Sequence, residues 1–211
     1  MNQGLDIIFQ ATILIFSIII HEISHGYVAL ALGDPTAKYA GRLTLNPIPH
    51  IDLFGSIILP IISFATGGFI FGWAKPVPYN PYNLRNQKWG SAIVGAAGPL
   101  SNILIAFFFG MLIRIMPYFF SEPTQFLANL VSIASFIVFL NVLLAIFNLL
   151  PIPPLDGSKV LFAMLPYQFR YIQDFLEQYG FIILLFFIFF LFRLLYPVIQ
   201  IVFSIFTGIG F

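Results

Sequence analysis

The sequence predicts an all-α polytopic membrane protein, a helical bundle of about four to six membrane segments with a re-entrant hairpin or a short β element. Hydrophobic residues make up 60% of the 211 residues and charged residues only 8%, whereas soluble domains carry about 25% charged residues. The mean hydropathy of +0.98 points the same way. The apolar stretches are long and continuous rather than alternating, which favours helices over a β-barrel.

The first predicted membrane helix covers residues 5–32. At about 1.5 Å per residue it is ~42 Å long, enough to cross a bilayer with one end protruding. Gly33 and Pro35 follow it as a stop signal. The opening residues contain Asp6 and no Lys or Arg. We therefore interpret this segment as a retained helix with a non-cytoplasmic N-terminus, rather than as a signal peptide.

The next region contains no clean membrane span. Residues 37–47 alternate in places and carry β-branched and aromatic side chains, so they are a candidate short strand. Residues 53–74 form a short apolar stretch that Pro60 and Gly67 interrupt. We expect this stretch to be a re-entrant hairpin that enters and leaves the membrane on one side. Such backbone is tolerated at membrane depth only where protein or water covers it, so the hairpin predicts a nearby cavity.

Two more full-length spans are predicted over residues 91–116 and 126–150. The last apolar region, residues 180–211, contains Arg193 and Pro197. We expect it to be either one long kinked helix or one span followed by an interfacial piece.

The chain shows no internal repeat and no soluble domain. We therefore predict a single domain over residues 1–211, with a catalytic core over about residues 5–165 and a C-terminal membrane-helix region over residues 178–211. The formal net charge is +1 and no basic tail is present, which gives no reason to expect a nucleic-acid partner. Cysteine is absent, which excludes disulfides and thiolate chemistry.

The positions of Lys and Arg predict the orientation. Basic residues gather between the first two full-length spans, at Lys38, Arg42, Lys75, Arg85 and Lys88, and again after the third, at Lys159 and Arg170. The connection over residues 117–125 has Glu122 and no Lys or Arg. These positions place residues 33–90 and 157–178 in the cytoplasm and residues 117–125 outside.

Three ionisable side chains, His21, Glu22 and His25, interrupt the apolar first helix as H-E-x-x-H. Two His at i and i+4 lie on one helix face and can share a metal ion, and the adjacent Glu can act as a general base. The alternative is two core histidines bonded to nearby backbone and a Glu that reaches the interface. That alternative is weak, because three ionisable groups on one membrane turn are costly without a partner.

A catalytic zinc needs a third protein ligand and an open fourth position. The candidates are His50 and the remaining carboxylates, among which Asp156 stands apart. It follows an apolar span and a proline-rich stretch that stops helical hydrogen bonding, and Gly157 permits a tight turn. The predicted orientation puts Asp156 and the H-E-x-x-H motif near the same membrane face, so they can meet.

Five segments carry a resemblance to a known family: HEISHGYVA, GRLTLNPIPHIDLFGSIILP, FGWAKPVPYNP, GPLSN and NLLPIPPLDG. They resemble the site-2 protease family of intramembrane zinc metalloproteases, in particular its short bacterial and archaeal branch without PDZ or CBS domains. The resemblance covers about residues 15–165. It implies one Zn²⁺ per chain, bound by His21, His25 and Asp156, with Glu22 as the catalytic base.

The resemblance also implies roles for other residues. Asn148 is expected near the substrate or the reaction intermediate. Asn102 matches a helix-packing element, although it can equally be a polar residue that bonds across helices. His50 is a candidate transient ligand or gate, or else an interfacial structural histidine. Residues 67–79 match a re-entrant element whose edge would bind an unwound substrate as an added strand.

By this resemblance the protein would hydrolyse peptide bonds in or near transmembrane segments of membrane proteins, in regulated intramembrane proteolysis. It would lie in a prokaryotic cell membrane as a multi-pass protein with its active site toward the cytoplasm. Its partners would be a transmembrane protein substrate and the lipid bilayer, and the oligomeric state is left open. One alternative is a zinc or proton-coupled transporter, but transporters usually show repeated halves. The other is a catalytically inactive relative.

Overall fold

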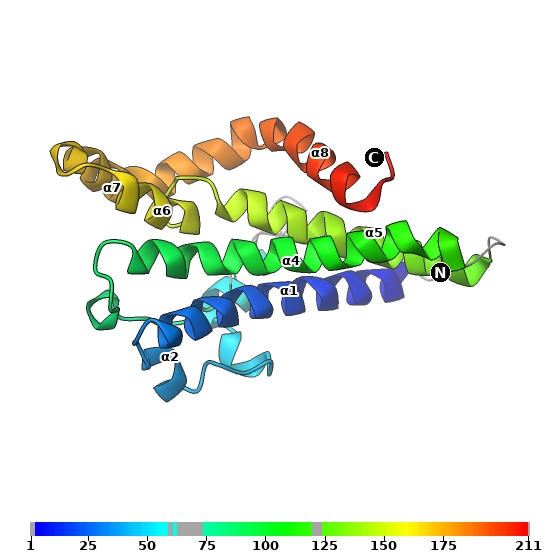
Figure 1. Ribbon diagram of the computed structural model, residues 1–211, viewed down its shortest axis with the longest axis horizontal. Coiled ribbons are helices and arrows are strands. Elements are labelled where there is room, and N and C mark those ends of the chain that lie inside the picture. Colours follow the sequence, from blue (N-terminus) through cyan, green and yellow to red (C-terminus); the bar gives the residue numbers. More distant parts are fainter. Residues whose placement is uncertain (1–2, 59–60, 63–73, 120–123, 211) are drawn as a thin grey trace.

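The computed structural model describes residues 3–58, 61–62, 74–119 and 124–210. Three long helices lie side by side: α1 (Gln3–Ala31), α4 (Gly90–Phe119) and α5 (Gln125–Asn148) (Figure 1). A fourth, α8 (Leu195–Thr207), packs against α4 and α5. No strand is present in the described ranges, which confirms the all-α class.

Four helical stretches are long and apolar enough to cross a membrane: residues 8–31, 90–119, 125–148 and 167–207. The first three agree with the predicted spans, and the fourth overlaps the predicted region 180–211 but begins 13 residues earlier, at residue 167. The four predicted spans are therefore confirmed, with an earlier start for the last. The main core lies between α4, α5 and α8 and consists of Ala106, Ile113, Ala134, Val138, Val142, Leu195, Ile199 and Phe203. Small alanines in this core let the helices approach closely, as is usual for membrane helices.

The last apolar region is one bent helical stretch, as one of the two alternatives predicted. It runs from α7 (Arg170–Phe186) through the π turn η5 (Phe187–Leu191) and the 3₁₀ turn η6 (Phe192–Leu194) into α8 (Figure 1). Pro197 lies in the first turn of α8. Because proline has no N–H, it cannot bond to the carbonyl four residues earlier, which breaks the regular ladder at the bend.

The short strand expected over residues 37–47 is wrong. The segment begins instead as the single helical turn α2 (Thr36–Tyr39). The Asp34 carboxylate accepts hydrogen bonds from the backbone N–H (3.2 Å) and the hydroxyl (2.5 Å) of Thr36, an Asx turn that leads into this helical turn. Gly41 then takes a left-handed φ of 65°, which turns the chain. These local contacts outweigh the alternating pattern.

The predicted re-entrant hairpin is described only in part. Residues Leu53–Ile58 form a π turn, η2, while residues 59–60 and 63–73 lie outside the described ranges. The hairpin therefore stays a prediction. The following residues 74–80 have no regular secondary structure.

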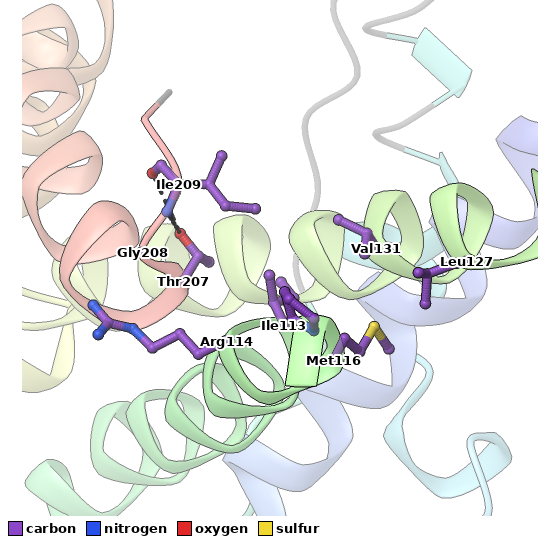
Figure 2. Close-up of a pocket in the computed structure, with 9 residues that line it drawn as sticks. Ile113, Arg114, Met116, Leu127, Val131, Thr207, Gly208 and Ile209 are labelled. Carbon is purple, nitrogen blue, oxygen red and sulfur yellow. Dashed lines mark hydrogen bonds between the residues drawn. The ribbon is translucent and has the colours of Figure 1, made fainter. Parts of the chain in front are cut away.

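A cavity of about 290 Å³ opens where the C-terminal end of α4 meets the start of α5 and the end of α8 (Figure 2). Its lining is mostly apolar, with Arg114 at the edge. The Arg114 guanidinium donates to the carbonyls of Ile205 (2.6 Å) and Phe206 (3.0 Å). Carbonyls in the last turn of a helix lack intrahelical partners, so Arg114 caps α8.

Candidate metal centre

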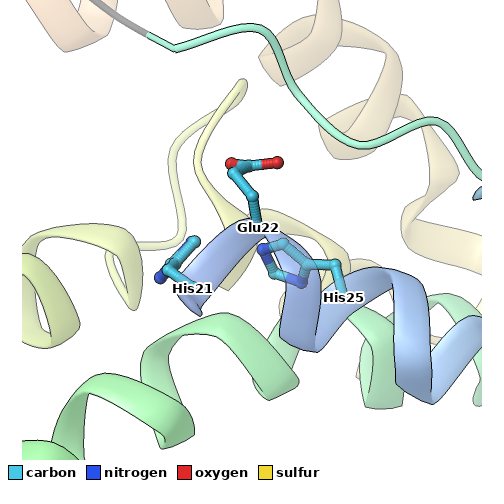
Figure 3. Close-up of side chains that lie close together, drawn as sticks. All are labelled: His21, Glu22 and His25. Atoms are coloured by element: carbon cyan, nitrogen blue, oxygen red, sulfur yellow. The ribbon is translucent and has the colours of Figure 1, made fainter. Parts of the chain in front are cut away.

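Helix α1 places His21, Glu22 and His25 on two successive turns (Figure 3). Each offers a ligand atom, and these three atoms lie within 4.8 Å of one another. The two imidazoles are buried, with ring centroids 4.7 Å apart and planes at 87°. The i, i+4 spacing therefore brings both rings to one place, as the sequence predicted.

Asp156 completes this group from a distant part of the chain. It is the first residue of α6 (Asp156–Met164), and its Oδ2 lies 3.0 Å from His21 Nε2 and 3.1 Å from His25 Nε2. Gly157 allows this approach, because a Cβ there would lie 2.1 Å from the carbonyl oxygen of Leu149 at the end of α5. The structure thus brings together the three residues that the sequence analysis selected as ligands.

Asp156 has two different environments at its two oxygens. While Oδ2 faces the histidines, Oδ1 accepts a 2.9 Å bond from Lys159 Nζ. Burial alone would raise the pKa of Asp156, but bonds from His21 and His25 and the charge of Lys159 hold it well below its usual range. The carboxyl group is therefore ionised, as a metal ligand must be. Sequence reasoning missed Lys159, although its i, i+3 spacing from Asp156 was a signal.

The other ring nitrogen of each histidine is held by α4. His25 Nδ1 lies 2.7 Å from the carbonyl oxygen of Val94, which can only accept, so Nδ1 carries the proton. His21 Nδ1 lies 2.6 Å from Oδ1 of the fully buried Asn102. Both contacts leave Nε2 to point at Asp156. The sequence left two roles open for Asn102: helix packing, or a polar bond across helices. The structure shows that Asn102 bonds across helices to His21, a candidate ligand.

Gly98 of α4 keeps the space beside both Nε2 atoms open. A Cβ at this position would lie 2.5 Å from Nε2 of His21 and 2.5 Å from Nε2 of His25. Two imidazole nitrogens and one carboxylate oxygen converge on the space that only glycine leaves free. Such a donor set fits a zinc ion with an open fourth position.

Glu22 points away from α4 in Figure 3 and contacts a different segment. Its Oε2 accepts a 2.7 Å bond from the backbone N–H of Val77. Residues 74–80 are held there by other bonds: Arg42 donates to the Lys75 carbonyl (2.6 Å), and the backbone N–H of Asn80 donates to Asp34 (2.6 Å). The sequence could not predict this contact, because its donor is a backbone N–H, which every residue except proline carries.

The two remaining candidates lie apart from this group. His50 is buried and its Nε2 lies 2.9 Å from the carbonyl of Thr44, so it belongs to the loop after α2. Asn148 is half-buried and donates to the Leu144 carbonyl of its own helix at 2.9 Å. Neither side chain bonds to any of the three candidate ligands among the residues that the structure describes.

Membrane-length helices around a buried His–His–Asp group, with a glutamate beside it, form the arrangement of a membrane-embedded metallopeptidase. Comparison with known proteins agrees with this class. The profile of peptidase family M50 matches residues 115–191. The chain belongs to this family, the site-2 proteases, as its similarity to the following relatives shows.

A Bacillus subtilis protein named "Putative zinc metalloprotease YwhC" is 40% identical over 173 residues, which cover 82% of this chain and 76% of the relative. Rip2 of Mycolicibacterium smegmatis, named in the same way, is 31% identical over 80% of this chain and 62% of its own length. Zinc metalloprotease MJ0392 of Methanocaldococcus jannaschii is 26% identical over 82% of this chain and 39% of its own length. No solved structure gave a significant match.

Proposed function

We propose that this protein is a zinc metalloprotease that hydrolyses peptide bonds in or near the transmembrane segments of membrane proteins. The observation that carries the proposal is the meeting of Asp156 with His21 and His25, 3.0 and 3.1 Å away, beside Glu22. The names of the relatives, which specify zinc metalloproteases, support zinc as the metal.

We assign His21 Nε2, His25 Nε2 and Asp156 Oδ2 as the three metal ligands. When bound, zinc would lower the pKa of water at its open position toward neutrality and polarise the substrate carbonyl. The half-buried Glu22 is the catalytic base. The Val77 N–H engages its Oε2, so we assign Oε1 to proton transfer, first from the attacking water and then to the leaving amide nitrogen.

The basic residues support an active site near the cytoplasmic face. In Figure 1, α2, α6 and the start of α7 lie at one end of the bundle, and the N-terminus lies at the other. Helices α2 and α6 belong to the predicted cytoplasmic segments, and Asp156 is the first residue of α6. Water would reach the site from this side. Asn148 and an added substrate strand along residues 67–79 remain candidates for substrate binding, and residues 67–73 lie outside the described ranges.

A helical substrate hides its peptide bonds in i→i−4 hydrogen bonds, so it must unwind locally before cleavage. Helix-breaking residues in the substrate would lower that cost. We therefore expect cleavage to favour membrane segments with Gly, Pro or polar residues near the cytoplasmic face.

The test compares membrane-protein fragments from cells that express either the native chain or Glu22→Gln. Glu22→Gln should bind zinc as the native chain does and lose cleavage by about 10²–10⁴-fold, which is the usual contribution of a general base. Fragments that appear equally with both forms would refute the assignment. Zinc uptake into liposomes with no cleavage of any membrane peptide would favour a transporter instead.

A further inference from the structure

Behind His21, buried polar side chains form a chain of bonds across three helices. Asn102 of α4 and Asn141 of α5 are 0% exposed, and Ser17 of α1 is 5% exposed. Asn102 Nδ2 donates to Asn141 Oδ1 at 2.8 Å, and Asn141 Nδ2 donates to Ser17 Oγ at 3.0 Å. Polar groups this deep in a membrane bundle are retained where they bond to one another. The metal ligands and base do not include Asn141 or Ser17, so their role is open.

The direction of every bond in this chain is fixed at its far end. Asn141 Nδ2 also donates to the carbonyl of Ile137, one turn earlier in α5, at 2.9 Å. A carbonyl can only accept, so the amide nitrogen of Asn141 must face it and the amide oxygen must face Asn102. Asn102 therefore presents its nitrogen to Asn141 and its oxygen to His21 Nδ1, 2.6 Å away.

An amide oxygen only accepts, so His21 must carry its proton on Nδ1 and keep the lone pair on Nε2. Nε2 is the atom that lies 3.0 Å from Asp156 Oδ2 and borders the space left by Gly98. Asn102 Nδ2 has a second acceptor, the Ser17 backbone carbonyl, but at 3.4 Å that bond is long and weak beside the 2.8 Å bond to Asn141. The amide of Asn141 on α5 is thus the stronger of the two groups that orient Asn102 and, through it, His21.

We propose that Asn141 is a positioning residue of the metal centre, which fixes the tautomer of His21 through Asn102. This inference rests on the proposed metalloprotease function. Without the Asn141 oxygen, only the long 3.4 Å bond to the Ser17 carbonyl still orients the Asn102 amide, which can then turn over and present its nitrogen to His21 Nδ1. That arrangement favours the tautomer protonated on Nε2, which has no lone pair for a metal. Ser17 assists by accepting the second N–H of Asn141.

The test measures zinc affinity by competition with a chelator, using the purified full chain in detergent. Asn141→Leu should weaken zinc binding by about 10–100-fold, the usual effect of losing a group that orients a ligand. Asn141→Asp should stay within about 3-fold of the native chain, because a protonated carboxyl still accepts from Asn102 and donates to Ile137. Asn129→Leu makes the same change at an exposed site of α5 and should have no effect.

A double variant separates tautomer control from packing. In Asn102→Asp, both carboxylate oxygens accept, so His21 Nδ1 keeps its partner whichever way the group turns. The double variant, Asn102→Asp with Asn141→Leu, should therefore bind zinc within about 3-fold of Asn102→Asp alone. Should Asn141→Leu fail to fold, Asn141→Ala removes the same amide oxygen and is measured in its place.

Native zinc affinity in folded Asn141→Leu would overturn the positioning role and leave the proposed function standing. Equal losses in Asn141→Leu and Asn141→Asp, or no rescue by Asn102→Asp, would overturn it in favour of packing. A native chain that binds no zinc would overturn the proposed function and the positioning role together.

Discussion

Gly98→Ala should separate the stability of helix α4 from metal binding. A Cβ at position 98 would lie 2.5 Å from Nε2 of both His21 and His25, whereas real Cβ atoms almost never approach closer than 3.0 Å. With α4 held in place by its packing, the two nitrogens must retreat by at least 0.5 Å, the difference between these two distances. The displacement falls on the two atoms that we assign to the metal.

The size of this shift decides the expected effect. Zinc–nitrogen bonds are about 2.0–2.1 Å long and tolerate deviations of about 0.2 Å, so a 0.5 Å retreat of both imidazoles exceeds the tolerance. We expect zinc affinity to fall by at least about 100-fold, the upper end of the effect of disturbing an orienting group. The helix itself should not suffer, because alanine in a helix interior is favoured over glycine by about 0.5–1 kcal/mol.

The assay pairs two measurements on the purified chain: zinc affinity by chelator competition, and thermal unfolding without metal. Gly210→Ala is the control, since among the described residues no atom other than those of its chain neighbours lies within 4 Å of a Cβ there. Gly98→Ala should lose zinc and stay folded with a modestly lower unfolding temperature, because crowding of the two buried imidazoles costs about 1–3 kcal/mol and the better helix propensity offsets only part of it, while Gly210→Ala should bind zinc normally. Native zinc affinity in Gly98→Ala would refute the placement of the metal between the two imidazoles and Asp156.

Three further predictions test other parts of the site. Asp156→Asn should lower zinc affinity by about 100-fold or more and abolish cleavage, and a folded variant with native zinc content would contradict its role as a ligand. Arg42→Met frees the carbonyl of Lys75, so it should loosen the segment that holds Glu22 and reduce kcat by about 10-fold with zinc content unchanged; a fall in zinc instead would contradict this. Burial would raise the pKa of Asp34, but bonds from Thr36, Asn83 and the Asn80 N–H bring it below 3.8. The ionised carboxylate therefore stabilises the folded state fully above pH 3.8, and this stabilisation is lost as the pH falls further. Asp34→Asn should therefore cost about 1–3 kcal/mol of unfolding free energy at neutral pH and progressively less in acid, and a cost that does not change with pH would count against the ionised carboxylate as the cause.

The membrane helices and the candidate ligands could be predicted from the sequence for physical reasons. A bilayer requires long apolar segments, so hydropathy identified all four stretches that the structure shows. An i, i+4 histidine pair must share a helix face, and the basic residues indicated that Asp156 lies at the same depth. These inferences used rules that hold whatever the tertiary packing is.

The other parts of the site depend on packing and left weak or no signals. The bond from the Val77 N–H to Glu22 uses backbone, which carries no residue-specific information. Asn141 looks like any polar residue in a membrane span, and only its contacts reveal that it faces Asn102. The strand expected at residues 37–47 failed because the bonds from Thr36 to Asp34 and the turn at Gly41 set the local backbone.

The structure supports the two halves of the site from different directions. The half with the proposed ligands is held from inside the bundle, since His21 bonds to Asn102 of α4, which bonds to Asn141 of α5. The base half is held from outside it, since Arg42 anchors residues 74–80 against Glu22. These supports share no side chain, so their effects should be separable and nearly additive. Changes at Asn141 should therefore act on metal affinity, and changes at Arg42 on turnover at constant metal. Under the proposed function, this separation would let a substrate bind beside the proposed base without disturbing the proposed ligands.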